Sequence, residues 1–152
     1  MTDALHDQPA AGRFVEGEHR FPLRVYFEDT DLTGVVYHAN YLRYFERARS
    51  DMLAVAGIDQ RAAFEAGEGA YAIRALNVRY VAPARLNDAL VVFSRVLRIR
   101  AAAVSIHQRV MRGNDIVAEA EVEAAFVTPS GRPRRQPTEW LAAFEPLLWK
   151  GN

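Results

Sequence analysis

The chain has 152 residues, of which 50% are apolar and 25% are charged, and it contains no cysteine. A chain of this length can bury about two-thirds of its unfolded surface around one core, so one domain is expected and disulfide scaffolds, thiolate metal sites and cysteine nucleophiles are excluded. The 19 basic residues balance 19 acidic ones, which leaves no overall field for holding nucleic acid or an anionic membrane surface.

The N-terminal residues predict a flexible tail over residues 1–19. They are small and polar at the start, and they lack the cationic segment followed by an apolar stretch that marks a secretory signal. No apolar run approaches the roughly 18 to 20 residues that span a bilayer. We therefore expect a cytoplasmic protein that does not insert into membranes.

The first regular element predicted is a strand over residues 21–27. Phe21, Leu23, Val25 and Phe27 recur at every second position, which is the pattern of a strand with one buried face. The segment from Glu28 to Val36 follows, and its Asp, Thr and Gly residues are typical of a loop.

A long amphipathic helix is predicted from Asn40 to Ala56. Its apolar residues recur at intervals of three and four, with arginine and acidic residues filling much of the rest. Asn40 is the expected N-cap, and Gly57 is the expected stop. A short second helix is expected from Asp59 to Ala66.

The rest of the chain reads as strands joined by short connections, with a final short helix around Trp140 to Leu148. Short connections between long strands indicate antiparallel pairing, so we expect an α+β fold with one dominant helix on a five-stranded antiparallel sheet. One helix cannot cover such a sheet, which predicts a homo-oligomer. The predicted strands are residues 70–81, 89–100, 103–112 and 116–128.

The loop before the long helix carries the residues best suited to chemistry. Glu28, Asp29 and Asp31 lie within four positions, and His38 follows where the helix begins. The free N–H groups at a helix start can stabilise a developing oxyanion, while a carboxylate opposite attacks or activates water. The conjugate acid of a thiolate has a pKa of ~8.5, so a thiolate leaves with little or no help from a proton donor. Thioesters are therefore the natural substrate class for this arrangement, which uses neither serine nor cysteine as the nucleophile.

Structural roles remain open for the same residues. Asp29 is expected to form a turn, and an isolated histidine such as His38 is often only a satisfied polar residue. Glu46 is either a second acid or the partner of a neighbouring arginine. The spacing of the acidic residues fits no metal loop, so no metal is expected. No Gly-x-Ser-x-Gly elbow, phosphate loop or dinucleotide fingerprint is present.

The segment from Phe27 to Arg49, FEDTDLTGVVYHANYLRYFERAR, resembles the signature of hotdog-fold acyl-CoA thioesterases. Within them it is most similar to the 4-hydroxybenzoyl-CoA thioesterase type and its Tol-Pal-associated bacterial branch. Further matches are Tyr80 to Asp88 and Gly131 to Arg135. The resemblance extends over residues 20–148, which gives a single hotdog domain preceded by the tail.

The resemblance implies a central helix wrapped by the sheet, subunits joined edge to edge as a homodimer or homotetramer, and hydrolysis of acyl-CoA without a cofactor. It assigns Asp31 as nucleophile or general base, and His38 as the residue whose N–H polarises the thioester carbonyl and whose side chain assists. The implied substrate-binding residues are Gly34, Val35, Val36, Tyr37, Tyr41 and Glu46, and the candidates for binding CoA phosphates are Arg98, Arg100, Arg132 and Arg134.

Two other functions remain open at this point. One is hydration or dehydration of an enoyl or hydroxyacyl thioester on the same fold, which the loop Asp31 with His38 at the helix start disfavours. The other is a non-catalytic role as an acyl-CoA-binding protein or envelope-complex partner. Leu32 stands where the branch more often has a small residue, so the shape of the acyl site is an open question.

Overall fold

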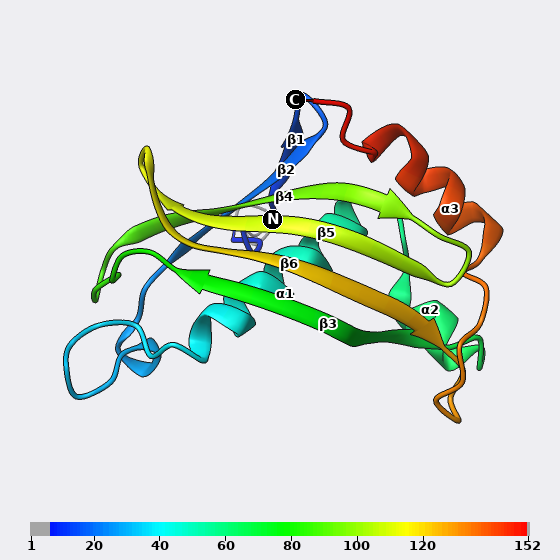
Figure 1. Cartoon of the computed structure of the whole chain (residues 1–152), viewed down its shortest axis with the longest axis horizontal. Helices are drawn as coiled ribbons and strands as arrows, with labels where there is room; N and C mark the ends of the chain where they lie inside the picture. The colour runs from blue at the N-terminus through cyan, green and yellow to red at the C-terminus, as the bar shows by residue number, and fades with distance from the viewer. Residues whose placement is uncertain (1–6, 152) are drawn as a thin grey trace, which may run out of the picture.

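One antiparallel sheet forms the body of the protein. The computed structural model describes residues 7–151, and in that range six strands follow the spatial order β1-β2-β4-β5-β6-β3. Every neighbouring pair is antiparallel, and Figure 1 shows the strands as one twisted layer. The strands are β1 Arg13–Val15, β2 Glu18–Arg24, β3 Ala70–Tyr80, β4 Ala89–Ile99, β5 Ala103–Arg112 and β6 Asp115–Val127.

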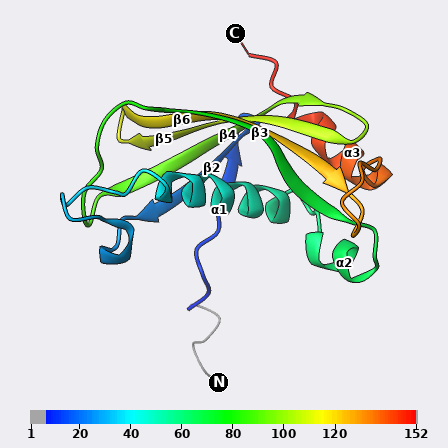
Figure 2. The same cartoon turned by 60° about the horizontal axis from the view of Figure 1, so that its bottom comes forward.

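The long helix α1, Asn40–Val55, lies along one face of this sheet (Figure 2). Its apolar stripe is buried against the strands, and the helix ends where Gly57 adopts a φ of 86°, a conformation that favours glycine. The predicted helix and its stop are confirmed. The buried residues of α1 are Tyr41, Tyr44, Phe45, Ala48, Met52 and Leu53.

The start of α1 differs by one residue from the prediction. The N-cap is Ala39, and Asn40 is already helical. Asn40 is the first residue inside the helix and so does not cap it; its Nδ2 donates instead to the carbonyl oxygen of Asp29 at 2.8 Å. Asn40 thus connects the helix to the preceding loop.

Two short helices complete the fold, as the sequence predicts. Helix α2, Gln60–Glu65, is capped by Asp59, whose side chain accepts from the N–H of Ala62 at 2.9 Å. Helix α3, Thr138–Phe144, continues into the 3₁₀ turn η3, Glu145–Leu147, and packs over the end of β4. It closes a second core cluster at the far end of the sheet.

The N-terminal part of the sheet corrects the sequence prediction. The expected strand over residues 21–27 is displaced, since β2 ends at Arg24 and the chain turns into the 3₁₀ helix η2, Phe27–Asp29, which leaves the Phe27 side chain 82% exposed. Strand β1 pairs with β2, so the expected count of five strands is wrong. Residues 13–19 therefore lie in strands and their hairpin and not in the expected tail, of which residues 1–6 lie outside the described residues.

The two faces and two edges of the sheet have different surroundings. The face toward α1 is largely apolar, although buried Gln108 on it donates to the carbonyl of Phe45 in α1, whereas the outer face carries ion pairs such as Arg74 with Glu123. Strand β3 is an edge strand, and most of its residues are exposed, including Ile73, Leu76 and Tyr80.

No helix within residues 7–151 is long and apolar enough to cross a membrane.

Candidate active site

The loop between β2 and α1 is held by hydrogen bonds within itself. The carboxylate of Asp29 accepts from the backbone N–H of Tyr26 at 2.7 Å, and the hydroxyl of Thr30 donates to the carbonyl of Phe27 at 2.9 Å. The carbonyl of Asp29 accepts from the N–H of Tyr37 at 2.9 Å. These contacts agree with the expected role of Asp29 as a turn former.

Asp31 begins a tight turn at the tip of this loop. Its N–H donates to the carbonyl of Val35, and its carbonyl accepts from Gly34, both at 3.0 Å. Gly34 has a φ of +81°, which a residue with a side chain rarely adopts. The turn is therefore closed by backbone bonds, and a glycine is needed at its fourth position.

The Asp31 carboxylate is exposed and is fixed through one of its two oxygens. Oδ1 accepts from the backbone N–H of Thr33 at 2.8 Å and from the Thr33 hydroxyl at 2.5 Å. Oδ2 accepts no hydrogen bond from a described residue. The Thr33 hydroxyl, then its N–H, and the charge of nearby His38 lower the pKa of Asp31, so this carboxyl is ionised at neutral pH.

The loop that carries Asp31 leads into α1, whose first turn presents backbone donors. Among residues 7–151, the N–H groups of His38 and Ala39 donate no hydrogen bond to another backbone group. The His38 carbonyl accepts from the Tyr80 hydroxyl at 2.9 Å, which ties the helix start to the edge strand β3. The charge of His38 also contributes to the lowered pKa of Asp31, after the two hydrogen bonds from Thr33.

The structure separates the expected substrate-binding residues into two groups. Gly34, Val35 and Tyr37 lie in the same loop as Asp31, and Tyr37 is 45% exposed with its ring 4.5 Å from that of His38. Val36 and Tyr41 are buried in the core beneath them.

Glu46 lies farther along α1, away from the loop. It lines a groove of about 210 Å³ between α1 and β3, together with Leu42, Phe45, Arg49, Ile73 and Leu76. Glu46 also acts electrostatically on Arg49, whose pKa is lowered chiefly by burial. Within residues 7–151 Glu46 forms no ion pair, because the Arg49 guanidinium donates instead to Oε1 of Gln108 at 2.9 Å.

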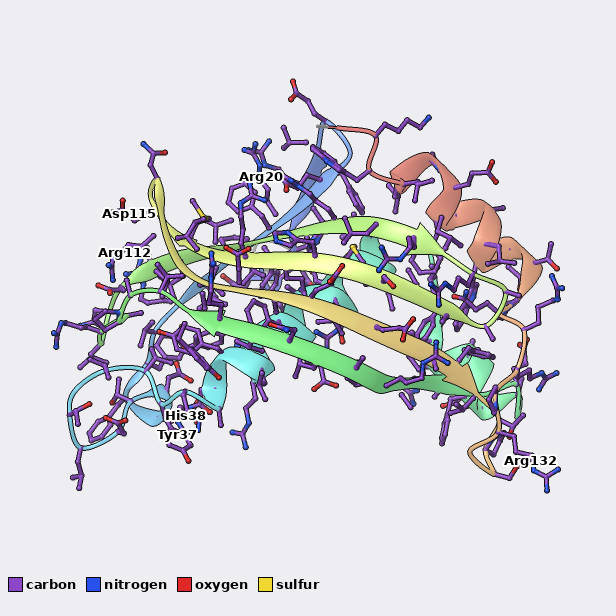
Figure 3. The ribbon with its side chains drawn as sticks, in the orientation of Figure 1. Arg20, Tyr37, His38, Arg112, Asp115 and Arg132 are labelled. Atoms are coloured by element: carbon purple, nitrogen blue, oxygen red, sulfur yellow. The ribbon has the colours of Figure 1, made fainter. Side chains whose placement is uncertain are left out.

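The arginines expected to bind CoA lie at the other end of the molecule. Arg98 pairs with Glu121 at 3.6 Å, and Arg100 pairs with Glu123 at 3.4 Å, both near the end of β4. Arg134 donates to the carbonyl of Glu68 at 2.7 Å. Figure 3 shows Arg132 at the end opposite Tyr37 and His38. One chain therefore does not bring these arginines to Asp31.

Two contacts of the site were not anticipated from the sequence. The Thr33 hydroxyl holds Asp31, and the Tyr80 hydroxyl holds the carbonyl of His38. A further cation, Arg85, lies beside the loop, since it forms an isolated bridge with Val35. The spacing of Asp31 and Thr33 is a sequence signal for the first contact, because a residue two positions after an aspartate often bonds its carboxylate.

One long helix lying along a strongly twisted antiparallel sheet is the architecture of the hotdog fold, which the matched thioesterase structures share. The chain belongs to the thioesterase-like superfamily, whose model matches residues 25–144. The predicted hotdog fold and family are thus confirmed.

Named relatives agree with this assignment. The acyl-CoA thioesterase YbgC of Haemophilus influenzae is 39% identical over 128 residues, which covers 84% of this chain and 94% of the relative. The acyl-CoA thioester hydrolase YbgC of Escherichia coli O157:H7 is 40% identical over 128 residues, covering 83% and 95%.

Solved structures share the architecture. A probable thioesterase from Bartonella henselae superimposes with a TM-score of 0.75 at 34% identity, covering 79% of this chain and 99% of the other. A 4-hydroxybenzoyl CoA thioesterase variant, complexed with 4-hydroxybenzoyl CoA, gives a TM-score of 0.75 at 20% identity, covering 83% and 97%. At that lower identity the likeness concerns the fold alone.

Proposed function

We propose that this protein hydrolyses acyl-CoA thioesters to a free carboxylic acid and CoA, with Asp31 as general base or nucleophile and the N–H of His38 polarising the carbonyl. The observation that carries the proposal is the exposed Asp31 carboxylate, one oxygen of which accepts no hydrogen bond from residues 7–151, in the loop that leads to the His38 N–H at the start of α1. The activity of the YbgC relatives supports the same reaction.

The chemistry runs by one of two routes that share an oxyanion. As general base, Asp31 takes a proton from water while the water oxygen attacks the thioester carbon. As nucleophile, Asp31 attacks that carbon itself and forms an anhydride, which water then cleaves. In both routes the carbonyl oxygen becomes negative beside the His38 N–H, the C–S bond breaks, and CoA leaves as a thiolate.

The working unit of the proposal is a homodimer joined through β3, with pairing of dimers into a tetramer as a further step. Strand β3 has a free edge and exposed apolar side chains, which favours pairing with a second copy. Antiparallel pairing about a two-fold axis places the Ala70 end of one β3 beside the Tyr80 end of the other.

That arrangement gives the distant arginines a role. Arg132 and Arg134 lie near the Ala70 end of β3, where Arg134 bonds to Glu68, whereas Tyr80 contacts His38 at the other end. In a two-fold dimer, the Arg132 and Arg134 of one subunit approach the Asp31 loop of its partner. The candidate CoA-binding residues of this proposal are these two, followed by Arg98 and Arg100. A CoA thioester substrate also fits the expected cytoplasmic location.

A thiol-release assay over a series of aliphatic and aromatic acyl-CoA substrates tests the proposal. We expect free CoA in stoichiometric amounts with the acid, and we expect Glu28→Gln, which alters another exposed carboxyl of the same loop, to keep this activity. Acyl-CoA binding without thiol release would instead identify a binding protein. A change in enoyl absorbance without thiol release would identify a hydratase or dehydratase.

A further inference from the structure

Thr33 makes two hydrogen bonds to the same oxygen of Asp31. Its backbone N–H donates to Oδ1 at 2.8 Å and its hydroxyl donates to Oδ1 at 2.5 Å. The first bond is available to any residue other than proline at this position, because it uses only the main chain. The second bond needs a hydroxyl, so it belongs to threonine or serine alone.

The two bonds restrict how the carboxylate can turn. An exposed aspartate ordinarily rotates about its side-chain torsions, and a reacting group gains from having that freedom removed beforehand. With Oδ1 held from two directions, the carboxylate plane is fixed and Oδ2 is the oxygen left without a donor among the described residues. That oxygen is the one available to water or to the thioester carbon.

We propose that Thr33 is a positioning residue, whose hydroxyl holds Oδ1 of Asp31 so that Oδ2 faces the reacting carbon. The proposal rests on the proposed function, since it assigns Thr33 a role through Asp31.

The electrostatic consequence agrees with this geometry. The Thr33 hydroxyl is the largest cause of the lowered pKa of Asp31, ahead of the Thr33 N–H and the charge of His38. A hydroxyl that donates to a carboxylate stabilises its ionised form. Without the hydroxyl, the pKa of Asp31 rises toward its ordinary value, and the carboxylate regains rotational freedom.

Three variants isolate the hydroxyl. Thr33→Val removes the hydroxyl and keeps a similar shape and the backbone N–H. Thr33→Ser keeps the hydroxyl and removes only a methyl group. Thr30→Val is the matched control, because the Thr30 hydroxyl also bonds within this loop, but to the carbonyl of Phe27 and not to Asp31.

Two measurements on the full-length protein give independent readouts. The first is the pKa of the Asp31 carboxyl, followed by carbon-13 NMR titration. The second is the pH profile of kcat/KM for acyl-CoA hydrolysis. In Thr33→Val we expect a higher Asp31 pKa, and we expect the acid limb, which is the acidic side of the kcat/KM pH profile, to move to higher pH by the same amount. We also expect kcat to be lower by about tenfold, with little change in KM. Thr33→Ser and Thr30→Val should keep the natural pKa and the natural acid limb.

The possible results separate the two proposals. An unchanged Asp31 pKa and unchanged kcat in Thr33→Val would overturn the role of Thr33, while loss of activity in Asp31→Asn would still support the proposed function. A raised Asp31 pKa with no movement of the acid limb, together with an active Asp31→Asn variant, would overturn both. Equal losses in Thr33→Val and Thr30→Val, without a pKa change, would show only general disturbance of the loop and would also overturn the positioning role.

Discussion

The carboxylates of Asp31 and Asp51 both accept two hydrogen bonds. The partner of Asp31 is close to it in the sequence, whereas the partners of Asp51 are more than 30 positions away. Asp31 is bonded by Thr33, two positions away, in an exposed turn. Asp51, on α1, accepts from the N–H of Gly12 at 2.9 Å and contacts Nε2 of buried His19 at 2.7 Å. The first carboxylate is oriented by its own loop, whereas the second joins the helix to the N-terminal hairpin.

This difference separates a group available for chemistry from one committed to the fold. Asp31 is exposed, and one of its oxygens accepts no hydrogen bond from the part of the chain that the structure describes, so its loss leaves no buried group there unpaired. Asp51 is the partner of a fully buried imidazole, so its loss leaves a polar group without a bond inside the protein. Substitutions at the two positions should therefore affect different measurements.

The largest expected effect is on catalysis at Asp31. Asp31→Asn replaces the carboxylate with a near isostere that is neither a base nor a nucleophile, and kcat/KM should fall by at least about a hundredfold. Steady-state thiol release measures the loss, and thermal unfolding should show an unchanged midpoint. Full turnover in this variant would remove Asp31 from the mechanism.

At Asp51 we expect a substitution to lower the stability of the fold and to leave catalysis nearly unchanged. Asp51→Ala removes the acceptor for Gly12 and for His19, and the free energy of unfolding should fall by about 2–3 kcal/mol. Urea denaturation measures this change, and kcat at a temperature where the variant is folded should stay near the natural value. A large loss of kcat in the folded variant would contradict the division between the two sites.

A substitution on the edge strand tests whether the Asp31 site needs a second copy. Leu76 is exposed on β3, and Leu76→Glu places a charge on the surface that pairs in the proposed dimer. We expect sedimentation to show monomers, because burying a charge without a partner in the dimer interface is unfavourable. We also expect kcat/KM to fall by about tenfold or more, because each monomer lacks the residues that its partner contributes. The contacts of Asp51 lie within one chain, so monomers should still fold. An active monomer would exclude the shared site.

Acid should weaken the Asp51 region through His19. Burial lowers the pKa of His19 below its ordinary value of 6.5, although the Asp51 carboxylate acts against this shift. The unfolded chain therefore binds a proton more readily, so the stability from this group is present above pH 6.5 and is lost as the pH falls through the lowered value.

The measurement is the unfolding free energy of the natural protein and of His19→Gln between pH 8 and pH 5. Below pH 6.5 the natural protein should lose up to about 1.4 kcal/mol more per pH unit than the variant. Parallel curves for the two proteins would show that His19 titrates normally.

The smallest effect is expected for a local ion pair on the surface. Arg61 and Glu65 lie one turn apart on α2, with their charged atoms 2.9 Å apart and both side chains largely exposed. Arg61→Ala should change the unfolding free energy by no more than about 0.5 kcal/mol. Urea denaturation in low and high salt would detect a larger contribution, which would show that exposed local contacts also support this fold.

The sequence is most informative where a contact is local or periodic. The apolar spacing after Asn40 predicts α1 nearly to its end, and the four later strands are predicted to within a residue or two. Asp31 and His38 are likewise indicated by one short segment. These features depend on neighbours within a few positions, so the order of residues carries them directly.

Features that depend on distant neighbours were not predictable in the same way. The alternation that ends at Phe27 gives no sign that the chain leaves the sheet after Arg24, where Val25 donates to the carbonyl of Asp88. The three residues of β1 are too few to show a period, and their pairing with β2 depends on a turn with positive φ at both Glu16 and Gly17. The pairing of Asp51 with His19 joins residues 32 positions apart.

The hydroxyl of Tyr80 has a consequence for how this enzyme is assayed. It belongs to the strand proposed to join two copies, and it donates to the carbonyl of His38, whose N–H is the proposed oxyanion donor. On that proposal, one hydrogen bond connects the subunit interface to the oxyanion donor. If the dimer is the active form, turnover per chain should decline when the protein is diluted below the dissociation constant of the dimer. Newly synthesised chains would then become active only after their concentration exceeds that constant.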